Sequence, residues 1–471
     1  MMPPPNRQHF DLAIIGAGPA GLAAATRAQH HGLSVIVLDE GSQPGGRIYH
    51  AVDRVMDSRP ADVALLGEDY THGANLTMAF RQSGVDYADA TSVFRLDQDG
   101  TVWFTRGGTA GTLRADNIIL ATGAMERPVP LPGWTLPGVM TAGAAQLLLK
   151  GDNMIPSGPV VLMGAGPLIL LCAIQLHDAG AAVTAIVETT TMLDTLRALP
   201  HLPRALLAQE YLRKGLTLRR RLKKAGIAIY GGATGLRILG TEKATGVSFQ
   251  SGGKATALNA DTVLLHNGVV PETHLSRQLG CRHRWDSVQR CWRPESDAWG
   301  QTSVPTVYVA GDGGGIAGAR AAECAGHLSA LRIATTSGRL NPHDCTRLAR
   351  AWIRERRHHL TIRPFLDSMF RPSPDLLSPP DDETIVCRCE EVDTRAIRHA
   401  TEMGCPGPNQ LKAFCRAGMG PCQGRMCQLT ITEIMAEARN TSPDEIGTIT
   451  IRPPVKPVTL SALAAMANDS E

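Results

Sequence analysis

The chain has 471 residues, of which 43% are hydrophobic, 19% are charged and 4% are aromatic. This length and composition indicate a globular protein of more than one domain, and they exclude a disulfide-stapled mini-protein or a mainly disordered chain. Lysine and arginine number 47 against 44 aspartates and glutamates. The resulting charge of +3 is too small to favour a nucleic-acid or membrane partner, so we expect a protein or a small molecule.

The sequence carries no signal for export or membrane insertion. No window approaches 18 uninterrupted apolar residues, and the proline-rich start Met1–Phe10 lacks a hydrophobic signal-peptide core. Six of the 11 cysteines fall between Cys387 and Cys427, a clustering that fits a metal centre in a reducing compartment better than disulfides. We therefore expect a soluble, cytoplasmic protein.

The start of the chain predicts a dinucleotide-binding βαβ unit. An apolar run of strand length, 11–15, precedes Gly16, Gly18 and Gly21, and a helix-forming stretch follows. In such a unit the first glycine makes the tight turn and the second lets the backbone approach a pyrophosphate at the helix N-terminus. The third glycine permits close packing of helix on strand.

An acidic pair follows at the distance that this unit requires. The second apolar run, 35–38, ends at Asp39 and Glu40, 18 and 19 residues beyond Gly21. A carboxylate here accepts hydrogen bonds from the ribose hydroxyls. Asp39 has the better spacing, and Glu40 remains an alternative.

Three further motifs decide which dinucleotide is expected. They comprise Gly45, Gly46 and Arg47 after the acidic pair, Ala121, Thr122 and Gly123 at the end of a strand-like run, and Gly311 and Asp312 at the end of another. In this order the motifs resemble the flavoproteins with two dinucleotide-binding domains, the glutathione-reductase-like superfamily, over residues 8 to about 345. The resemblance implies FAD, with the aspartate of the last motif bound to the ribityl chain and phosphate.

A second unit of the same kind begins at residue 159. Its predicted order is a strand, the turn Gly164-Ala165-Gly166, a helix, and a second strand that ends at Glu188. Ile169 stands where glycine or alanine is expected, which should push the helix from the strand and weaken the pyrophosphate seat. Glu188 would favour a ribose without a 2′-phosphate. NAD(H) or another adenine nucleotide in this middle domain, and a vestigial domain kept as scaffold or protein interface, both remain open.

The region that resembles flavoproteins contains no recognisable redox cysteine pair and no recognisable acid–base pair. Cys172 is the first cysteine and stands alone in its domain, so thiol–disulfide chemistry is not expected. His50, Glu126, Arg127 and His266 are scattered along the chain, and we interpret each as an ordinary surface or core residue. The substrate chemistry is therefore expected elsewhere.

After an arginine-rich helix and a proline-rich extended linker at 346–380, the chain enters a cysteine-rich region. The pattern is C-x-C, 32 residues, then C-x4-C, formed by Cys387, Cys389, Cys422 and Cys427. Two close pairs of thiolates suit a 2Fe-2S cluster or one tetrahedral zinc, and a neighbouring flavin favours the cluster. The remaining two cysteines of the region, Cys405 and Cys415, are interpreted as buried small hydrophobes.

The motifs CRCEEV and RAGMGPCQGRMC resemble the bacterioferritin-associated-ferredoxin-like 2Fe-2S domain. The order of flavin domain, nucleotide domain and cluster domain, together with the segment ATGAMERPVPLPGWTLPGVMTAG at 121–143, resembles one group of enzyme subunits over about 8–440. These are the α (A) subunits of the opine oxidase, D-hydroxyproline dehydrogenase and hydrogen cyanide synthase group. The resemblance implies that the four paired cysteines ligate the cluster. It also implies a hetero-oligomer in which an amine-oxidising flavoprotein β subunit holds the substrate, with a small ferredoxin-like γ subunit in some complexes.

We therefore predict an α/β fold with two glutathione-reductase-like dinucleotide-binding domains, the second inserted in the first, and a small helical 2Fe-2S domain. The predicted segments are an FAD domain at 8–150 with its return at 276–345, a nucleotide domain at 155–275, a helix and linker at 346–380, a cluster domain at 381–440 and a tail at 441–471. The expected function is electron transfer for the oxidation of an opine or D-hydroxyproline-like imino acid. Alternatives are a glycine-oxidising hydrogen cyanide synthase subunit, an NADH-dependent flavin and iron–sulfur reductase, and a redox sensor without turnover.

Overall fold

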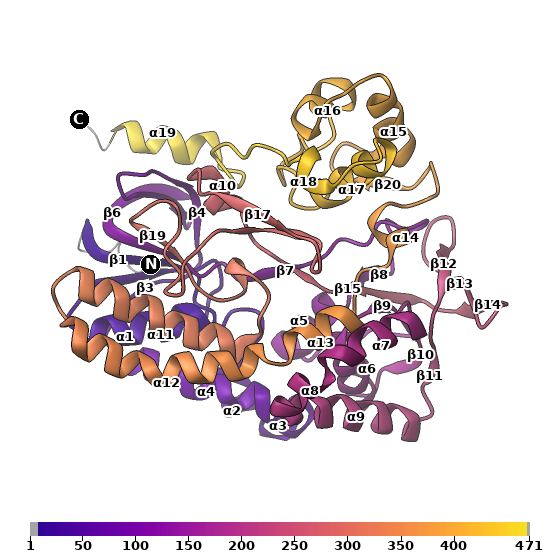
Figure 1. Cartoon of the computed structure of the whole chain (residues 1–471), viewed down its shortest axis with the longest axis horizontal. Coiled ribbons are helices and arrows are strands. Elements are labelled where there is room, and N and C mark those ends of the chain that lie inside the picture. Colours follow the sequence, from indigo (N-terminus) through magenta and orange to yellow (C-terminus); the bar gives the residue numbers. More distant parts are fainter. Residues whose placement is uncertain (1–7, 469–471) are drawn as a thin grey trace.

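A computed structural model describes residues 8–468 of the chain (Figure 1). Most of the proline-rich start and the last three residues of the predicted tail, 469–471, lie outside the described residues. The fold is α/β, as predicted, with two main sheets side by side and a helical C-terminal segment against one edge (Figure 1).

The first sheet has seven strands. They are β1 (His9–Ile15), β2 (Val35–Leu38), β3 (Asp86–Ala88), β4 (Thr91–Leu96), β5 (Thr101–Arg106), β6 (Thr109–Leu120) and β19 (Val307–Val309). The order is β3-β2-β1-β6-β5-β4, and β19 pairs with β6. All pairs are parallel except those that β5 makes with β4 and β6. The apolar runs of β1 and β2 are almost wholly buried, as expected for strands covered on both faces.

Helices pack beside this sheet in Figure 1. They are α1 (Pro19–His30), α4 (Glu68–Gln82), α11 (Ala319–Thr336) and α12 (Pro342–Leu360). The α2 (Val52–Ser58) and α3 (Pro60–Leu66) helices pack instead in the core of the second main sheet, through Val52, Val55 and Leu66. The α1 and α11 helices pack especially closely, because a Cβ at Gly326 would lie only 2.1 Å from the Ala20 carbonyl oxygen. The α12 helix covers α11 through a small core that includes Leu331 and Ala349.

The second sheet is fully parallel. Its strands are β8 (Val139–Thr141), β9 (Pro159–Ala165), β10 (Ala182–Glu188), β11 (Ala228–Tyr230) and β15 (Thr262–Asn267), in the order β11-β10-β9-β15-β8. Its helical elements are α5 (Ala142–Asp152), α6 (Pro167–Asp178), α7 (Met192–Ala198), η1 (Leu199–His201), α8 (Leu202–Ala205), η2 (Leu206–Ala208) and α9 (Gln209–Lys224). A separate antiparallel sheet contains β12 (Thr234–Leu239), β13 (Gly246–Ser251) and β14 (Lys254–Asn259).

Short elements carry the chain back to the first sheet. They are β7 (Ala124–Glu126) paired with β16 (Val269–Pro271), α10 (His274–Gln278), β17 (His283–Asp286) paired with β18 (Cys291–Pro294), and η3 (Gly311–Gly314) after β19. The first sheet thus contains strands from before and after the second sheet in sequence. The second sheet is inserted into the first, which is the arrangement predicted from the motifs.

The C-terminal segment is mainly helical. It contains α13 (Arg363–Met369), α14 (Pro374–Leu377), β20 (Ile385–Cys387), β21 (Val392–Asp393), α15 (Thr394–Glu402), α16 (Pro408–Cys415), α17 (Gln428–Ala438), α18 (Pro443–Ile446) and α19 (Leu460–Asn468). The helices predicted around the cysteines are present, and Ile397, Leu411 and Ile431 form part of their core.

The prediction of an extended linker between α12 and the cysteine-rich region is wrong in one respect. The α13 and α14 helices occupy most of the region after α12. Ile362 is buried beside Ala205 and Ala208, and Phe365 packs against the same cluster. Burial of these apolar side chains stabilises helical structure that the prolines alone did not indicate.

None of the helices formed by residues 8–468 combines the length and the hydropathy needed to cross a bilayer.

Candidate functional site

The glycine turn after β1 has the geometry of a dinucleotide-binding loop. Gly16 has φ of +108°, and a Cβ there would lie 2.5 Å from the Ala121 carbonyl oxygen. A Cβ at Gly21 would lie 1.9 Å from the Gly16 carbonyl oxygen. By contrast, a Cβ at Gly18 would meet no described atom within 4 Å beyond its chain neighbours. Gly16 and Gly21 are therefore required by packing, whereas Gly18 leaves space for a ligand.

The two acidic candidates differ in their surroundings. The Asp39 carboxylate accepts hydrogen bonds from the Ala17 amide at 2.5 Å and the Gly41 amide at 2.6 Å, and burial raises its pKa. Glu40 instead accepts a hydrogen bond from Ser92 at 2.9 Å and forms an ion pair with Lys456. Burial alone would raise the pKa of Glu40, but these two partners lower it. Only Asp39 contacts the glycine turn, so it stays the predicted ribose ligand.

The second glycine motif packs on the first. The Gly45 amide donates to the Ala17 carbonyl at 2.9 Å, and a Cβ at Gly46 would lie 2.8 Å from the Cα of Gly18. Arg47 donates to the Ala124 carbonyl oxygen at 3.4 Å. The structure thus joins this motif to the end of β1 and to the residue that follows Gly123.

The last two flavin motifs also meet. The β19 strand runs beside β6, and η3 follows it, so that a Cβ at Gly313 would lie 3.2 Å from Thr122 Oγ1. A Cβ at Gly311 would lie 3.0 Å from the Cβ of Ala20. Asp312 Oδ1 accepts from the amides of Ala317 at 2.8 Å and Gly318 at 2.9 Å.

Four motifs that are far apart in sequence therefore gather where the parallel strands β1, β2, β6 and β19 end. The carboxyl ends of such strands are where open α/β sheets bind ligands. The open space at Gly18 and the two carboxylates, each of which has further acceptor capacity, suit a dinucleotide. The residues present fit FAD, and their individual roles remain predictions.

The middle unit shows a different situation at its own glycine turn. Ile169 is fully buried in the core of the second sheet. Glu188 is 4% exposed, and both of its oxygens accept from Arg219 Nη2, at 2.8 and 3.0 Å. The Nε2 atom of His266 lies 3.0 Å from the position of a Cβ at Gly166. The predicted ribose ligand, Glu188, is thus paired with Arg219, and the glycine turn is in contact with His266.

Two residues interpreted as scattered are in direct contact. His266 Nδ1 lies 2.7 Å from Glu126 Oε1, and Glu126 Oε2 accepts from the Gly143 amide at 2.9 Å. The other two residues interpreted as scattered, Arg127 and His50, have different neighbours. Arg127 donates to the carbonyls of Gln289 and Arg290. His50 lies beside α5, where its Nε2 would be 3.0 Å from a Cβ at Gly151. The Glu126–His266 pair was missed because the residues are 140 positions apart.

The four candidate cluster ligands form two pairs. Cys389 Sγ lies 3.7 Å from Cys422 Sγ, and Cys387 is hydrogen-bonded to Cys427. Each pair takes one cysteine from each loop. The loops approach so closely that a Cβ at Gly420 would lie 2.1 Å from the Cβ of Cys389.

Local hydrogen bonds change the acidity of one pair of thiols. A hydrogen bond from Cys427 and several backbone amides lower the pKa of Cys387 to about 6, whereas the same bond and burial raise the pKa of Cys427. Cys405 and Cys415 lie outside both pairs and donate to nearby carbonyls. Cys405 is buried as predicted, and Cys415 is only partly buried.

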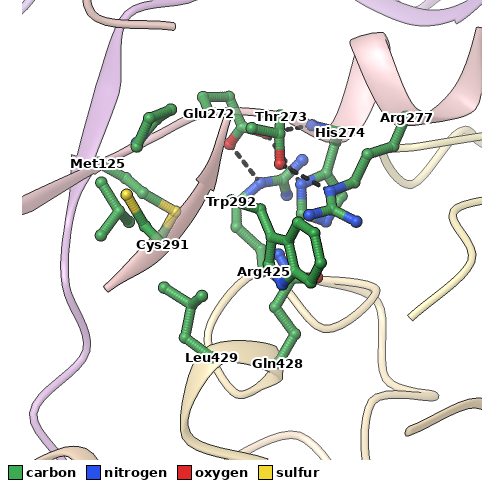
Figure 2. Close-up of a pocket in the computed structure, with 12 residues that line it drawn as sticks. Met125, Glu272, Thr273, His274, Arg277, Cys291, Trp292, Arg425, Gln428 and Leu429 are labelled. Carbon is green, nitrogen blue, oxygen red and sulfur yellow. Dashed lines mark hydrogen bonds and ion pairs between the residues drawn. The ribbon is translucent and has the colours of Figure 1, made fainter. Parts of the chain in front are cut away.

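Glu272 joins the flavin motifs to the cysteine loop, and Figure 2 shows its contact with Arg425 of that loop. Its amide donates to the Gly123 carbonyl at 3.0 Å, and its carbonyl accepts from Thr122 Oγ1 at 3.2 Å. Its carboxylate accepts from Arg425 Nε at 2.8 Å, and Arg425 lies between the ligand candidates Cys422 and Cys427. One residue therefore contacts both predicted cofactor regions.

His274 adds a second connection at this junction (Figure 2). Its Nδ1 lies 2.9 Å from Glu272 Oε1, and its Nε2 lies 3.2 Å from the carbonyl oxygen of Gln423 in the cysteine loop. Burial would raise the pKa of Glu272, but His274 and Arg425 hold it well below its usual range. No local pattern indicated this junction, since Glu272 and Arg425 are 153 positions apart.

Comparisons with known proteins agree with this architecture. The family model described as pyridine nucleotide-disulphide oxidoreductase matches residues 10–326, and the sarcosine oxidase A3 domain model matches residues 382–467. The chain therefore belongs to the pyridine nucleotide-disulphide oxidoreductase family. It is an FAD-dependent oxidoreductase, as the glycine motifs predicted.

Within this family the chain is similar to subunits of several enzymes. It is 44% identical over 468 residues to the A subunit of opine oxidase from Rhizobium meliloti, covering 98% of this chain and 88% of that one. It is 31% identical over 468 residues to the HcnB subunit of hydrogen cyanide synthase from Pseudomonas protegens, covering 95% and 96%. L-proline dehydrogenase from P. horikoshii has the same fold, with a TM-score of 0.68, 19% identity and coverage of 97% and 80%. The predicted resemblance to the opine oxidase group is confirmed.

Proposed function

We propose that the chain is the electron-transfer flavoprotein subunit of a heteromeric amine dehydrogenase or oxidase. The observation that carries this proposal is the junction at Glu272, which contacts Thr122 and Gly123 of the flavin motifs and Arg425 of the cysteine loop. Contacts of this kind would keep the two predicted redox groups at a fixed separation. The relatives from opine oxidase and hydrogen cyanide synthase are each named as one component of an enzyme, which supports the same role here.

The chain's own residues would divide the work of holding FAD. Gly18 leaves the backbone open for the pyrophosphate, Asp39 accepts from the ribose, and Asp312 lies at the ribityl end. Bound FAD supplies two-electron chemistry with the option of single-electron transfer. The Gly45–Gly46 turn, packed on Gly18, would exclude water from one side of the dinucleotide.

The two cysteine pairs suit a 2Fe-2S cluster. Cys387 with Cys427 would hold one iron, and Cys389 with Cys422 would hold the other, since each pair brings two sulfurs together from two loops. Such a cluster passes single electrons. The lowered pKa of the Cys387 thiol favours the thiolate that binds metal.

The substrate would be held by another polypeptide. The Glu126–His266 pair contacts the middle unit, where Glu126 accepts from the Gly143 amide and His266 lies beside the glycine turn. We therefore assign amine oxidation to an amine-oxidising flavoprotein β subunit, and a small ferredoxin-like γ subunit would be a further partner. An opine or a D-hydroxyproline-like imino acid is the proposed substrate, and the electrons would reach this chain and then an acceptor.

The complex can be tested directly. The native complex is co-purified with this chain as bait and assayed with a dye acceptor and a panel of octopine, nopaline, D-hydroxyproline, proline, sarcosine and glycine. We expect dye reduction by an opine or imino acid with the complex and none with the isolated chain. Reduction by glycine alone would replace the substrate assignment with the hydrogen cyanide synthase alternative. Full activity of the isolated chain would contradict the subunit role.

An NADH-dependent reductase is the second candidate, and the middle unit argues against it. Glu188 is paired with Arg219, and Ile169 replaces the third small residue of the motif. Anaerobic addition of NADH to the purified chain checks this point. We expect the flavin absorption to persist, whereas rapid bleaching would favour the reductase and would place NAD(H) in the middle unit.

A further inference from the structure

A cavity of about 160 Å³ lies between α11, α12 and the loops around the β17–β18 hairpin. Its lining includes Arg293, Trp299 and Arg356 and, after β19, Gly311 and residues 314–317. The exposed Ser296 also belongs to the lining, so the cavity meets the solvent there. Gly311 of the last flavin motif belongs to the lining, whereas Gly16, Gly18 and Gly21 do not, so the cavity adjoins the predicted ribityl end but not the glycine turn.

The charge of this cavity is positive. Arg293 and Arg356 are its charged lining residues, and no aspartate or glutamate of the described chain lines it. Arg293 Nη2 lies 3.3 Å from Asp286 Oδ2 outside the lining. Arg356 donates to the Ala298 carbonyl at 2.9 Å, and it forms no ion pair within 4.0 Å with a carboxylate of residues 8–468. One guanidinium charge is therefore paired and the other is not.

Unpaired polar atoms accompany this charge. Arg293 Nε and Gln289 Oε1 are buried without a hydrogen-bond partner among the described residues. Buried donors and acceptors are normally satisfied, so orphan atoms at a cavity indicate an occupant that the protein itself does not supply. The Gln289 amide is oriented by its Nε2, which donates to the Ile316 carbonyl at 3.2 Å and to Asp367 Oδ2 at 3.3 Å.

The remaining wall is mixed. It combines the apolar side chains of Trp299, Val309, Ile316, Ala325 and Leu360 with Ser296, Ser329 and glycine backbone. An inorganic anion would leave these apolar side chains in contact with water alone, whereas a small organic anion would cover them. A single uncompensated positive charge matches one carboxylate group better than a phosphate dianion.

We propose that this cavity is a binding site for a small organic carboxylate, held by Arg356 and Arg293 with its apolar part against Trp299 and Ala325. The proposal does not depend on the substrate assigned above, because it rests on the charge, volume and lining of this cavity alone. The ligand would lie against the 311–317 segment, which carries Asp312 on its way to α11.

Isothermal titration calorimetry of the full-length holoprotein with pyruvate and with propionate tests the proposal. We expect saturable binding of at least one of them, and binding weakened by about tenfold or more in Arg356→Gln, which loses a charge-assisted hydrogen bond. Arg356→Lys should recover part of the affinity. Arg354→Gln is the matched control, because Arg354 is exposed on the same helix outside the lining, and it should bind as the wild type does.

A second variant keeps the result interpretable if the arginine replacements perturb folding. Ala325→Leu retains both guanidinium groups but fills the cavity, and we expect it to abolish the binding while circular dichroism stays unchanged. Absence of saturable heat with either carboxylate, or equal binding by Arg356→Gln and the wild type, would overturn the site. Tighter binding of inorganic phosphate than of either carboxylate would overturn the ligand class. The substrate assay of the complex is unaffected by these outcomes.

Discussion

At the scale of single residues, Glu272 is the residue whose contacts matter most to the proposed function. Glu272→Gln removes the charge that faces Arg425 and His274. Since both side chains of the Glu272–Arg425 pair are only 20% exposed, we expect the free energy of unfolding to fall by about 1–3 kcal/mol at neutral pH. Urea denaturation of both proteins measures this difference.

The same variant predicts a pH dependence. The folded-state pKa of Glu272 lies below its unfolded value of about 4.5, so its stabilisation is complete above that pH and is lost as pH falls further. The difference between wild type and Glu272→Gln should therefore be constant at neutral pH and shrink below about pH 4. Glu383→Gln is the control, because that side chain is 83% exposed and its pair with Arg395 should contribute little at any pH.

Lys150 offers a prediction in the alkaline range. It is 3% exposed, its ammonium group donates to the Ile48 carbonyl and to Gln146, and burial lowers its pKa to about 8. The unfolded chain holds this proton to about pH 10.5, so stability of the wild type should rise between about pH 8 and 10, by up to about 3 kcal/mol. Lys150→Met should lack this rise in urea titrations at pH 7 and 10, and the exposed Lys254→Met should retain it.

At the scale of secondary structure, the contact between α1 and α11 depends on a glycine. A Cβ at Gly326 would lie 2.1 Å from a backbone oxygen of α1, so Gly326→Ala must separate the two helices that flank the predicted FAD site. We expect a loss of about 2 kcal/mol or more in unfolding free energy and weaker retention of FAD on dilution. Thermal unfolding and flavin content measure both effects.

Gly215 provides the matched control in another helix. It lies inside α9, and outside that helix no atom of residues 8–468 comes within 4 Å of the position that its Cβ would take. Gly215→Ala should therefore raise stability by up to about 1 kcal/mol, because alanine is the better helix former. A loss of stability in both variants would show that the α1–α11 contact is not the cause.

At the scale of the whole molecule, the chain should carry two separable chromophores. Cys389→Ser removes one sulfur of the Cys389–Cys422 pair and should sharply reduce the iron and acid-labile sulfide content while FAD content stays unchanged. Cys345→Ser, at a buried cysteine beside Leu331 in the α11–α12 core, should leave both unchanged. Elemental analysis and visible spectra of anaerobically prepared protein measure the iron, sulfide and FAD contents. Zinc in place of iron would contradict the cluster assignment.

Much of the fold followed from local pattern. The spacing of Gly16, Gly18 and Gly21 after an apolar run predicted the first βαβ unit, because strand, turn and helix are encoded by neighbouring residues. The insertion of the second sheet and the helices around the cysteines were also predicted. The region after α12 was not, since the burial of Ile362 against Ala205 and Ala208 depends on contacts that no local pattern reveals.

The sequence by itself determined the kind of dinucleotide turn, the sulfur ligand candidates and the family resemblance, because each depends on residue type at short spacing. Only the tertiary structure decided that Glu272 bridges Gly123 and Arg425, that Glu126 contacts His266 and that Arg356 lies in a positive cavity. These contacts join residues more than a hundred positions apart or depend on the packing of several elements, so their geometry is fixed by the assembly of sheets and helices rather than by any one segment.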